Sequence, residues 1–123
     1  MREKTIFLDV VGDTPTMRLL QYLIEGRKFD YTLTDLAKNS GVSWATLYSI
    51  FPKLLKYNII KKVREVGRAK LYKIDEENEI AKYFIQLYDY LLTINLKTSG
   101  VKIPDSAQKF KRISDKIEKT VIA

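Results

Sequence analysis

The side chains in this sequence that could do chemistry are cations, hydroxyls and aromatic rings. The 123 residues contain neither cysteine nor histidine. This removes thiol chemistry, the commonest general base and the commonest ligand of transition metals. The carboxylates show no spacing that indicates catalysis. We therefore expect no catalytic residue, no metal site, no cofactor and no enzymatic activity.

The positive charge is concentrated in one stretch of the chain. Lysine and arginine total 22 against 15 acids, a net charge of +7. Between Lys38 and Lys73 there are nine basic residues and one acid, Glu65, so nine minus one gives +8 there. Four acids follow within residues 75–79. A solvated lysine-rich surface would normally mix the two signs, so this separation predicts a polyanionic partner.

Two short helices joined by a tight turn are predicted for residues 33–51. Thr32 is a suitable N-cap for the first helix and Ser43 for the second, and Gly41 stands where a left-handed residue ends a helix. The inward-facing residues have the spacing of a helix-turn-helix: Leu33, Leu36, Ala37, Val42, Leu47 and Ile50. The same spacing also fits a corner between two helices in any helical domain.

A β-hairpin is predicted after the second helix. Residues 60–66 and 69–74 have period-two patterns and flank Gly67 and Arg68, a pair typical of a two-residue turn. The hairpin is strongly basic and carries Lys61, Lys62, Arg64, Arg68, Lys70 and Lys73. A basic hairpin directly after a helix-turn-helix indicates the wing of a winged helix.

With these pieces, residues 14–94 resemble the winged helix-turn-helix regulators of archaea and bacteria. The resemblance is carried by LTDLAKNSGVSWATLY, by NIIKKVREVGRAKLYKI and by the long helix predicted after them. It implies a mainly α fold with a small β-hairpin wing, a winged helix-turn-helix followed by a long C-terminal dimerisation helix. The expected nearest relatives are small archaeal regulators, and the arsenical-resistance and multiple-antibiotic-resistance regulators are more distant.

Four segments are expected along the chain. They are an N-terminal arm (1–13), a winged-helix DNA-binding domain (14–75), a dimerisation helix (76–95) and a helical C-terminal extension (96–123). The arm fits a helix or a strand equally well. The domain opens with a helix capped by Thr14, with Pro15 at its first position. Residues 29–31 are predicted to be extended. Within the extension, residues 96–103 are predicted as a loop and 104–121 as a helix.

The dimerisation helix is expected to begin at Asp75 and to be capped by Asp75 or Asn78. Its apolar stripe is wide for one small domain to cover, which predicts a homodimer. The predicted interface residues are Ile80, Tyr83, Phe84, Leu87 and Leu91. Alternatively, the stripe packs only on its own domain.

The second helix of a helix-turn-helix enters the major groove of DNA. With Leu47 and Ile50 inward, the residues left to contact DNA are Ser43, Trp44, Ala45, Thr46, Tyr48 and Ser49. Further predicted contacts come from Lys53 and from the hairpin residues Lys61, Lys62, Arg64, Arg68 and Lys70. Arg68, in the turn, is the best candidate for entering a minor groove.

Three residues depart from this pattern. Arginine is common in the family where Trp44 and Ser49 stand, so the bidentate guanine contact is missing here. Trp44 is expected to pack on sugars or thymine methyls, or else on a neighbouring protein. Pro52 predicts a kink or a break near Phe51, with the carbonyl of Tyr48 left without its helical partner.

The leading hypothesis is a sequence-specific transcription regulator that binds double-stranded DNA as a dimer. The alternatives are a low-specificity architectural, chromatin or plasmid DNA-binding protein, and a winged-helix module that binds protein. No signal peptide and no membrane-spanning stretch is apparent, so a cytoplasmic location is expected.

Overall fold

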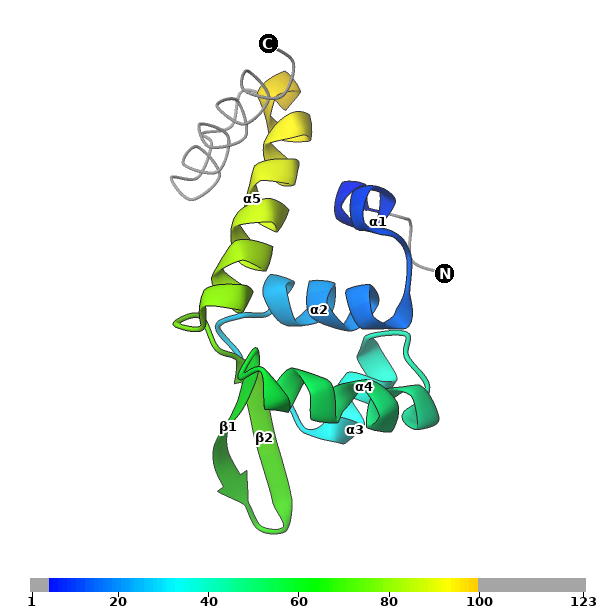
Figure 1. Ribbon diagram of the computed structural model, residues 1–123, viewed down its shortest axis with the longest axis vertical. Coiled ribbons are helices and arrows are strands. Elements are labelled where there is room, and N and C mark those ends of the chain that lie inside the picture. Colours follow the sequence, from blue (N-terminus) through cyan, green and yellow to red (C-terminus); the bar gives the residue numbers. More distant parts are fainter. Residues whose placement is uncertain (1–4, 100–123) are drawn as a thin grey trace. The chain divides into compact units, whose positions relative to one another are not determined.

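The computed structural model describes residues 5–99. In chain order the elements are α1 (Ile6–Val11), α2 (Pro15–Glu25), α3 (Leu33–Asn39), α4 (Trp44–Lys56), β1 (Ile60–Val66), β2 (Ala69–Ile74) and α5 (Glu79–Ser99) (Figure 1). The chain divides into two compact units, Met1–Lys82 and Tyr83–Ala123, and the boundary between them lies inside α5. The first unit contains the helix-turn-helix and the hairpin.

Local capping fixes where the helices of the first unit begin. Thr14 accepts a hydrogen bond from the backbone N–H of Met17, and Pro15 occupies the first turn, as predicted. Thr32 and Asp35 form a capping box, because each side chain accepts from the backbone N–H of the other, at 3.1 and 3.0 Å. These reciprocal bonds satisfy two donors that a helix start leaves unpaired.

The turn of the helix-turn-helix has the predicted conformation. Gly41 has φ +76°, the left-handed region that a residue with a Cβ rarely adopts. Val42 is 3% exposed and therefore fills the corner between α3 and α4. Ser43 then caps α4 by accepting from the N–H of Thr46.

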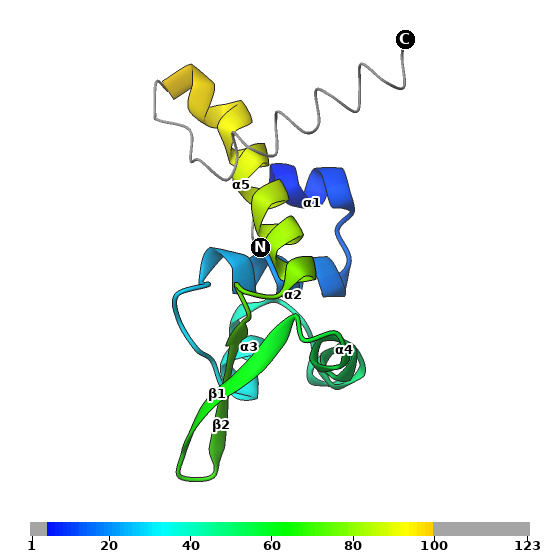
Figure 2. The same cartoon turned by 60° about the vertical axis from the view of Figure 1, so that its left-hand side comes forward.

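The core of the first unit is built around α2. Its four central apolar residues are at most 1% exposed: Leu19, Leu20, Leu23 and Ile24. In both views α1 lies on one side of α2, and α3 and α4 lie on the other (Figures 1 and 2). The two helices of the helix-turn-helix are therefore held by one central helix.

The N-terminal segment forms a helix rather than a strand. Thr5 caps α1 by accepting from the N–H of Leu8 at 3.2 Å, and its hydroxyl also donates to the side chain of Gln21 on α2. Phe7 is 2% exposed and Leu8 6%. Adjacent residues of a strand point to opposite faces, so a strand with one buried face would not bury both Phe7 and Leu8. Burial of both residues therefore fits the helix that Thr5 caps.

The hairpin strands have the predicted bounds, and the hairpin extends away from the helices (Figure 2). β1 and β2 are antiparallel, and Gly67 in the turn has φ +61°. A bulge at Val63 interrupts the register, because Lys62 pairs with Tyr72 and Arg64 with the next residue, Leu71. Only Tyr31 of the predicted extended segment pairs with the hairpin, through two 2.7 Å backbone bonds to Tyr72.

The long helix begins at Glu79 rather than at Asp75, and Asn78, one of the two predicted caps, is confirmed. The Asp75 carboxylate accepts from the N–H of Glu77, and Asn78 caps α5 by accepting from the N–H of Ala81, both at 3.0 Å. Residues 75–78 therefore form a turn. The helix continues to Ser99, so the loop predicted for 96–99 is wrong. The helix predicted for 104–121 lies outside the described residues.

Pro52 does not break α4, which runs through it to Lys56. The break considered from the sequence is therefore wrong. Pro52 and Tyr48 both lie on the exposed side of the helix, so water can bind the carbonyl that loses its N–H donor.

Candidate nucleic-acid interface

Helix α4 is anchored by one face and exposed on the other. Leu47, Phe51 and Leu54 are 0%, 5% and 3% exposed, at the i, i+4, i+7 spacing of a buried stripe. The inward orientation predicted for Leu47 is confirmed. Ile50 is half-buried, because it lies at the edge of this stripe rather than in its centre.

The exposed face of the N-terminal half of α4 forms what we call the α4 patch: Trp44, Ala45, Tyr48 and Ser49. All four are exposed. They occupy two i, i+4 pairs and are therefore neighbours on the helix surface. The patch contains no charged group and no side-chain amide, so its hydrogen-bonding groups are the indole N–H and two hydroxyls.

The two remaining predicted contacts on α4 are engaged in the cap. The Ser43 hydroxyl accepts from the N–H of Thr46 at 3.3 Å and donates to the Thr46 hydroxyl at 2.9 Å. Ser43 is exposed and Thr46 half-buried. Both therefore lie at the start of the helix, where backbone N–H groups attract anions.

Trp44 and Tyr48 stack on each other. Their ring centroids are 5.6 Å apart, with 30° between the ring planes. Trp44 is still 43% exposed and Tyr48 61%. The outward position of both rings is as predicted from the sequence, but the stack was not predicted. The i, i+4 spacing of two aromatic residues could have indicated it, because such residues are neighbours on a helix surface.

Three of the five hairpin cations predicted to contact DNA are held in ion pairs within the protein. Arg64 donates from Nε to Asp30 at 2.7 Å and from a terminal nitrogen at 3.2 Å. Two more pairs join Lys62 to Glu65 at 2.7 Å and Lys61 to Asp75 at 3.6 Å. The sequence predicts these three cations as DNA contacts, and their ion pairs with carboxylates were not predicted.

The bulge in β1 explains two of these pairs. Without it, Lys62 and Arg64 would point to the same face of the hairpin. Their partners Tyr72 and Leu71 are consecutive, so the two cations point to opposite faces. Lys62 then shares a face with Glu65, whose partner is Lys70. Arg64 faces the other way and pairs with Asp30, in the loop before α3.

The ion pairs also shift the protonation equilibria of their members. The guanidinium of Arg64 lowers the pKa of Asp30, chiefly through the hydrogen bond, and Asp30 raises the pKa of Arg64. In the same way Lys62 lowers the pKa of Glu65, and Glu65 raises that of Lys62. Both pairs are therefore ionised at neutral pH.

Arg68, Lys70 and Lys53 remain available as cations. None of the three forms an ion pair with another residue in the described part of the chain, and all are exposed. The hairpin is joined to α4 by an edge-to-face contact between Phe51 and Tyr72, with centroids 4.8 Å apart. This contact fixes the hairpin relative to α4.

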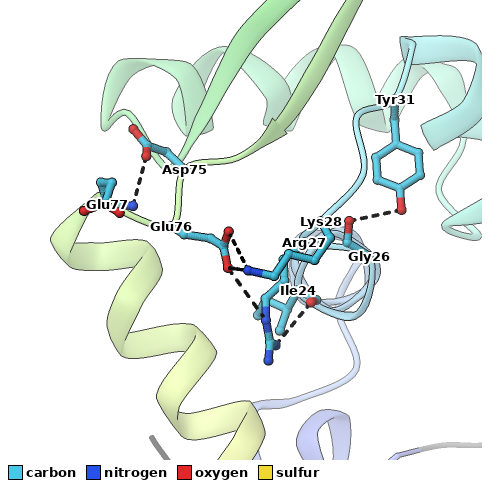
Figure 3. A network of polar contacts seen from close by, with 8 residues as sticks. All are labelled: Ile24, Gly26, Arg27, Lys28, Tyr31, Asp75, Glu76 and Glu77. Carbon is cyan, nitrogen blue, oxygen red and sulfur yellow. Dashed lines mark hydrogen bonds and ion pairs between the residues drawn. The ribbon is translucent and has the colours of Figure 1, made fainter.

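A polar network holds the loop after α2 against the turn before α5. Glu76 accepts from Lys28 at 3.1 and 3.3 Å and lies 3.9 Å from Nε of Arg27 (Figure 3). Tyr31 donates from its hydroxyl to the carbonyl oxygen of Gly26 at 3.2 Å (Figure 3). The sequence placed Glu76 inside the long helix and so missed this role.

The predicted interface residues on α5 differ in exposure. Ile80 is 39% exposed, Tyr83 60% and Leu91 6%, while Phe84 and Leu87 are half-buried. Ile94, which the prediction omitted, is 50% exposed. Ile80, Tyr83 and Ile94 are exposed and fall on one side of the helix together with the half-buried Leu87, in a heptad-like line, whereas Leu92, 41% exposed, lies off this line.

Residues 5–99 contain no group of acidic side chains placed to hold a metal ion. In the same range, no helix has both the length and the apolar character that crossing a bilayer needs.

No protein-family model and no curated protein sequence matches this chain. Solved structures do. An apo variant of ZitR from Lactococcus lactis is 19% identical with a TM-score of 0.54, over 92% of this chain and 89% of that one. MepR, a transcription regulator of the Staphylococcus aureus multidrug efflux pump MepA, is 16% identical with a TM-score of 0.52, over 92% and 84%.

A third similar structure is wild-type ZitR in complex with DNA. It is 18% identical with a TM-score of 0.50, over 87% of this chain and 75% of that one. The three likenesses show that the chain has the winged-helix fold, which confirms the predicted fold class. These neighbours come from bacteria, so the archaeal relationship stays a prediction.

Proposed function

We propose that this protein is a transcription regulator that binds double-stranded DNA sequence-specifically as a homodimer, in the cytoplasm and without enzymatic activity. One observation carries the proposal. One face of the N-terminal half of α4, the α4 patch, is exposed in a winged-helix fold, whereas Leu47, Phe51 and Leu54 hold the opposite face of the helix in the core. A helix seated in this way can enter the major groove with its N-terminal residues leading.

In the proposed complex the α4 patch meets base edges and the hairpin meets the backbone or the minor groove. Lys53, Arg68 and Lys70 bind phosphates, since none of the three forms an ion pair within residues 5–99. Arg68, in the turn, enters the minor groove where that groove is narrow. ZitR, whose structure is similar to this chain, has been solved in complex with DNA, which supports DNA as the partner.

The proposed dimer forms along α5. Ile80, Tyr83 and Ile94 are large apolar side chains between 39% and 60% exposed. Their spacing, with Leu87 between them, is that of a helix that pairs with a second copy of itself. Pairing would place two α4 helices roughly 34–36 Å apart, one turn of DNA, on a pseudo-palindromic site.

Selection of bound sequences from a random duplex pool tests the proposal. We expect a two-fold related consensus and an affinity for it at least about 10³-fold above that for random duplex. Trp44→Ala should weaken selection at the bases, whereas Lys53→Ala should weaken binding to all sequences alike. Absence of salt-dependent binding to any duplex would exclude DNA as the partner.

Light scattering tests the dimer separately. The wild type should have the mass of two chains at micromolar concentration. Tyr83→Lys combined with Ile94→Lys should give folded monomers, since both side chains are exposed and the core is untouched. Tyr57→Lys, a change at a ring 49% exposed at the end of α4, is the control and should leave the dimer intact. A monomeric wild type contradicts this part of the proposal.

A second candidate is a low-specificity architectural DNA-binding protein. It is favoured by the α4 patch, which lacks the guanidinium and amide groups that make bidentate contacts to bases. In that case the selection returns no consensus, and selected and random duplexes bind with equal affinity. A protein-binding winged helix, favoured by the exposed Trp44 and Tyr48, predicts no DNA binding at all.

A further inference from the structure

The α4 patch has a composition that leaves few ways to distinguish one base pair from another. Its polar groups are one indole N–H and two hydroxyls, and none has the paired, side-by-side groups that form two parallel hydrogen bonds to one base. What it presents in quantity is apolar surface, from the rings of Trp44 and Tyr48 and the methyl group of Ala45. In the major groove, the apolar feature that differs between bases is the C5 methyl group of thymine.

The stack makes these rings suitable for such a contact. Trp44 and Tyr48 restrict each other at 5.6 Å between centroids, so less side-chain freedom is lost on binding than for two independent rings. Ala45 and Ser49 directly follow Trp44 and Tyr48 along the helix and complete the surface. Neither has a long polar side chain that would keep the patch away from the floor of the groove. The patch is therefore a preformed, mostly apolar surface.

The surroundings identify nucleic acid as the occupant. A protein partner for exposed aromatic rings needs a matching apolar surface, and it would be repelled by cations unless it were acidic. Here Lys53 and Arg68, which form no ion pair within residues 5–99, place positive charge on α4 itself and on the hairpin that Phe51 joins to it, and Lys70 adds to this charge from its position opposite Glu65. The apolar patch thus lies on an element whose charge is complementary to a polyphosphate.

We infer that the stacked Trp44 and Tyr48 rings determine specificity by packing on thymine methyl groups in the major groove, so that this protein reads thymine by apolar contact. The inference rests on the proposed function, because it assigns a role to α4 within a DNA complex. Each buried methyl should improve affinity roughly 4-fold, the effect of transferring about one CH₂ group out of water.

The test compares two duplexes, alternating dA·dT and alternating dA·dU. They carry the same phosphates, the same minor groove and the same hydrogen-bonding groups, and they differ only in the C5 methyl of the major groove. We expect the wild type to bind the dA·dT duplex at least roughly 4-fold more tightly. Because Arg68 is assigned to the minor groove, its contribution cancels in this ratio.

Variants identify the residues responsible. Trp44→Ala and Tyr48→Ala should bring the ratio of the two affinities to about 1, while Tyr48→Phe, which keeps the ring, should retain it. Phe29→Ala is the matched control, because it removes a ring that is 68% exposed from the loop between α2 and α3. That variant should keep the wild-type ratio. Melting curves of the four variants check that each is folded.

Intrinsic fluorescence gives a second readout, since Trp44 is the one tryptophan in the sequence. Its emission should change when dA·dT duplex is added, in step with the anisotropy of the labelled DNA. Salt-dependent binding with an equal affinity for both duplexes, or with unchanged tryptophan emission, overturns this inference and leaves the proposed function standing. No binding to either duplex at low salt overturns both.

Discussion

The α4 patch and the hairpin differ in the way their side chains are prepared for a partner. The patch has no charge, and its two rings contact each other. The hairpin has abundant charge, but Lys61, Lys62 and Arg64 are already paired with carboxylates. The number of cations in a stretch therefore overstates the charge it can offer, because carboxylates neutralise part of it, and two of them, Asp30 and Asp75, lie outside the hairpin.

The difference suggests a division of labour in the proposed complex. The hairpin supplies electrostatic attraction from the cations that form no ion pair in the described part of the chain, chiefly Arg68 and Lys70. The α4 patch supplies discrimination between sequences, which charge alone does not give. Each of the following experiments separates the two regions.

The largest expected effect is that of salt on binding. A dimer that makes about 6–10 phosphate contacts should lose about 10³–10⁵-fold in affinity between roughly 50 and 200 mM salt. Trp44→Ala should leave the slope of this dependence unchanged, because it removes no charge. Fluorescence anisotropy with one labelled duplex measures both proteins. A slope that falls in Trp44→Ala would break the division between the two regions.

The next effect is that of the hairpin turn. Arg68→Ala should weaken binding to all sequences by about 10-fold and reduce the salt slope by roughly 1 per subunit. The control is Arg64→Ala combined with Asp30→Ala, which removes an arginine together with its internal partner and keeps the net charge. That variant should bind within about 2-fold of the wild type. Equal losses in the two variants would mean that the ion pair does not withdraw Arg64 from DNA.

A smaller effect, of opposite sign, is expected from Asp30→Asn. This change frees the Arg64 guanidinium without shortening a side chain, so affinity for DNA at low salt should rise by about 3-fold. The gain should vanish at high salt, because it is electrostatic. A weaker complex would instead show that the Asp30–Arg64 pair positions the hairpin for binding.

The smallest effect is that of pH. The pKa of Asp30 is lowered in the folded protein by its hydrogen bond with Arg64, so the pair stabilises the fold above the unfolded pKa, about 3.9. This contribution is lost as the pH falls through the lower, folded value. The stability difference between the wild type and Asp30→Asn should therefore be constant from about pH 6 to 8 and disappear in acid. Denaturant titrations at several pH values measure it.

DNA affinity should also change by less than about 2-fold between pH 6 and 8, since the sequence has no histidine. The paired carboxylates of Asp30 and Glu65 stay ionised throughout this range, because their cationic partners lower both pKa values. A strong dependence within it would require a titrating group that neither the α4 patch nor the hairpin contains.

The sequence alone determined the features that depend on a few neighbouring residues. Thr14, Thr32 and Ser43 cap helices where predicted, and Gly41 and Gly67 adopt the positive φ values that their turns need. A cap or a tight turn is settled within about four residues, so its chemistry is visible in the chain itself. The same holds for the exposed face of α4 and for the strand bounds.

Only the tertiary structure decided which charges are available. Arg64 finds Asp30 across 34 positions because the bulge at Val63 turns it to the other face of the hairpin. Lys61 likewise meets Asp75 because the backbone N–H of Asp75 donates to the carbonyl oxygen of Ile59 at 2.8 Å, which continues the strand pairing and holds Asp75 beside β1. Neither contact follows from periodicity or charge count, since one inserted residue in a strand reverses every side chain after it.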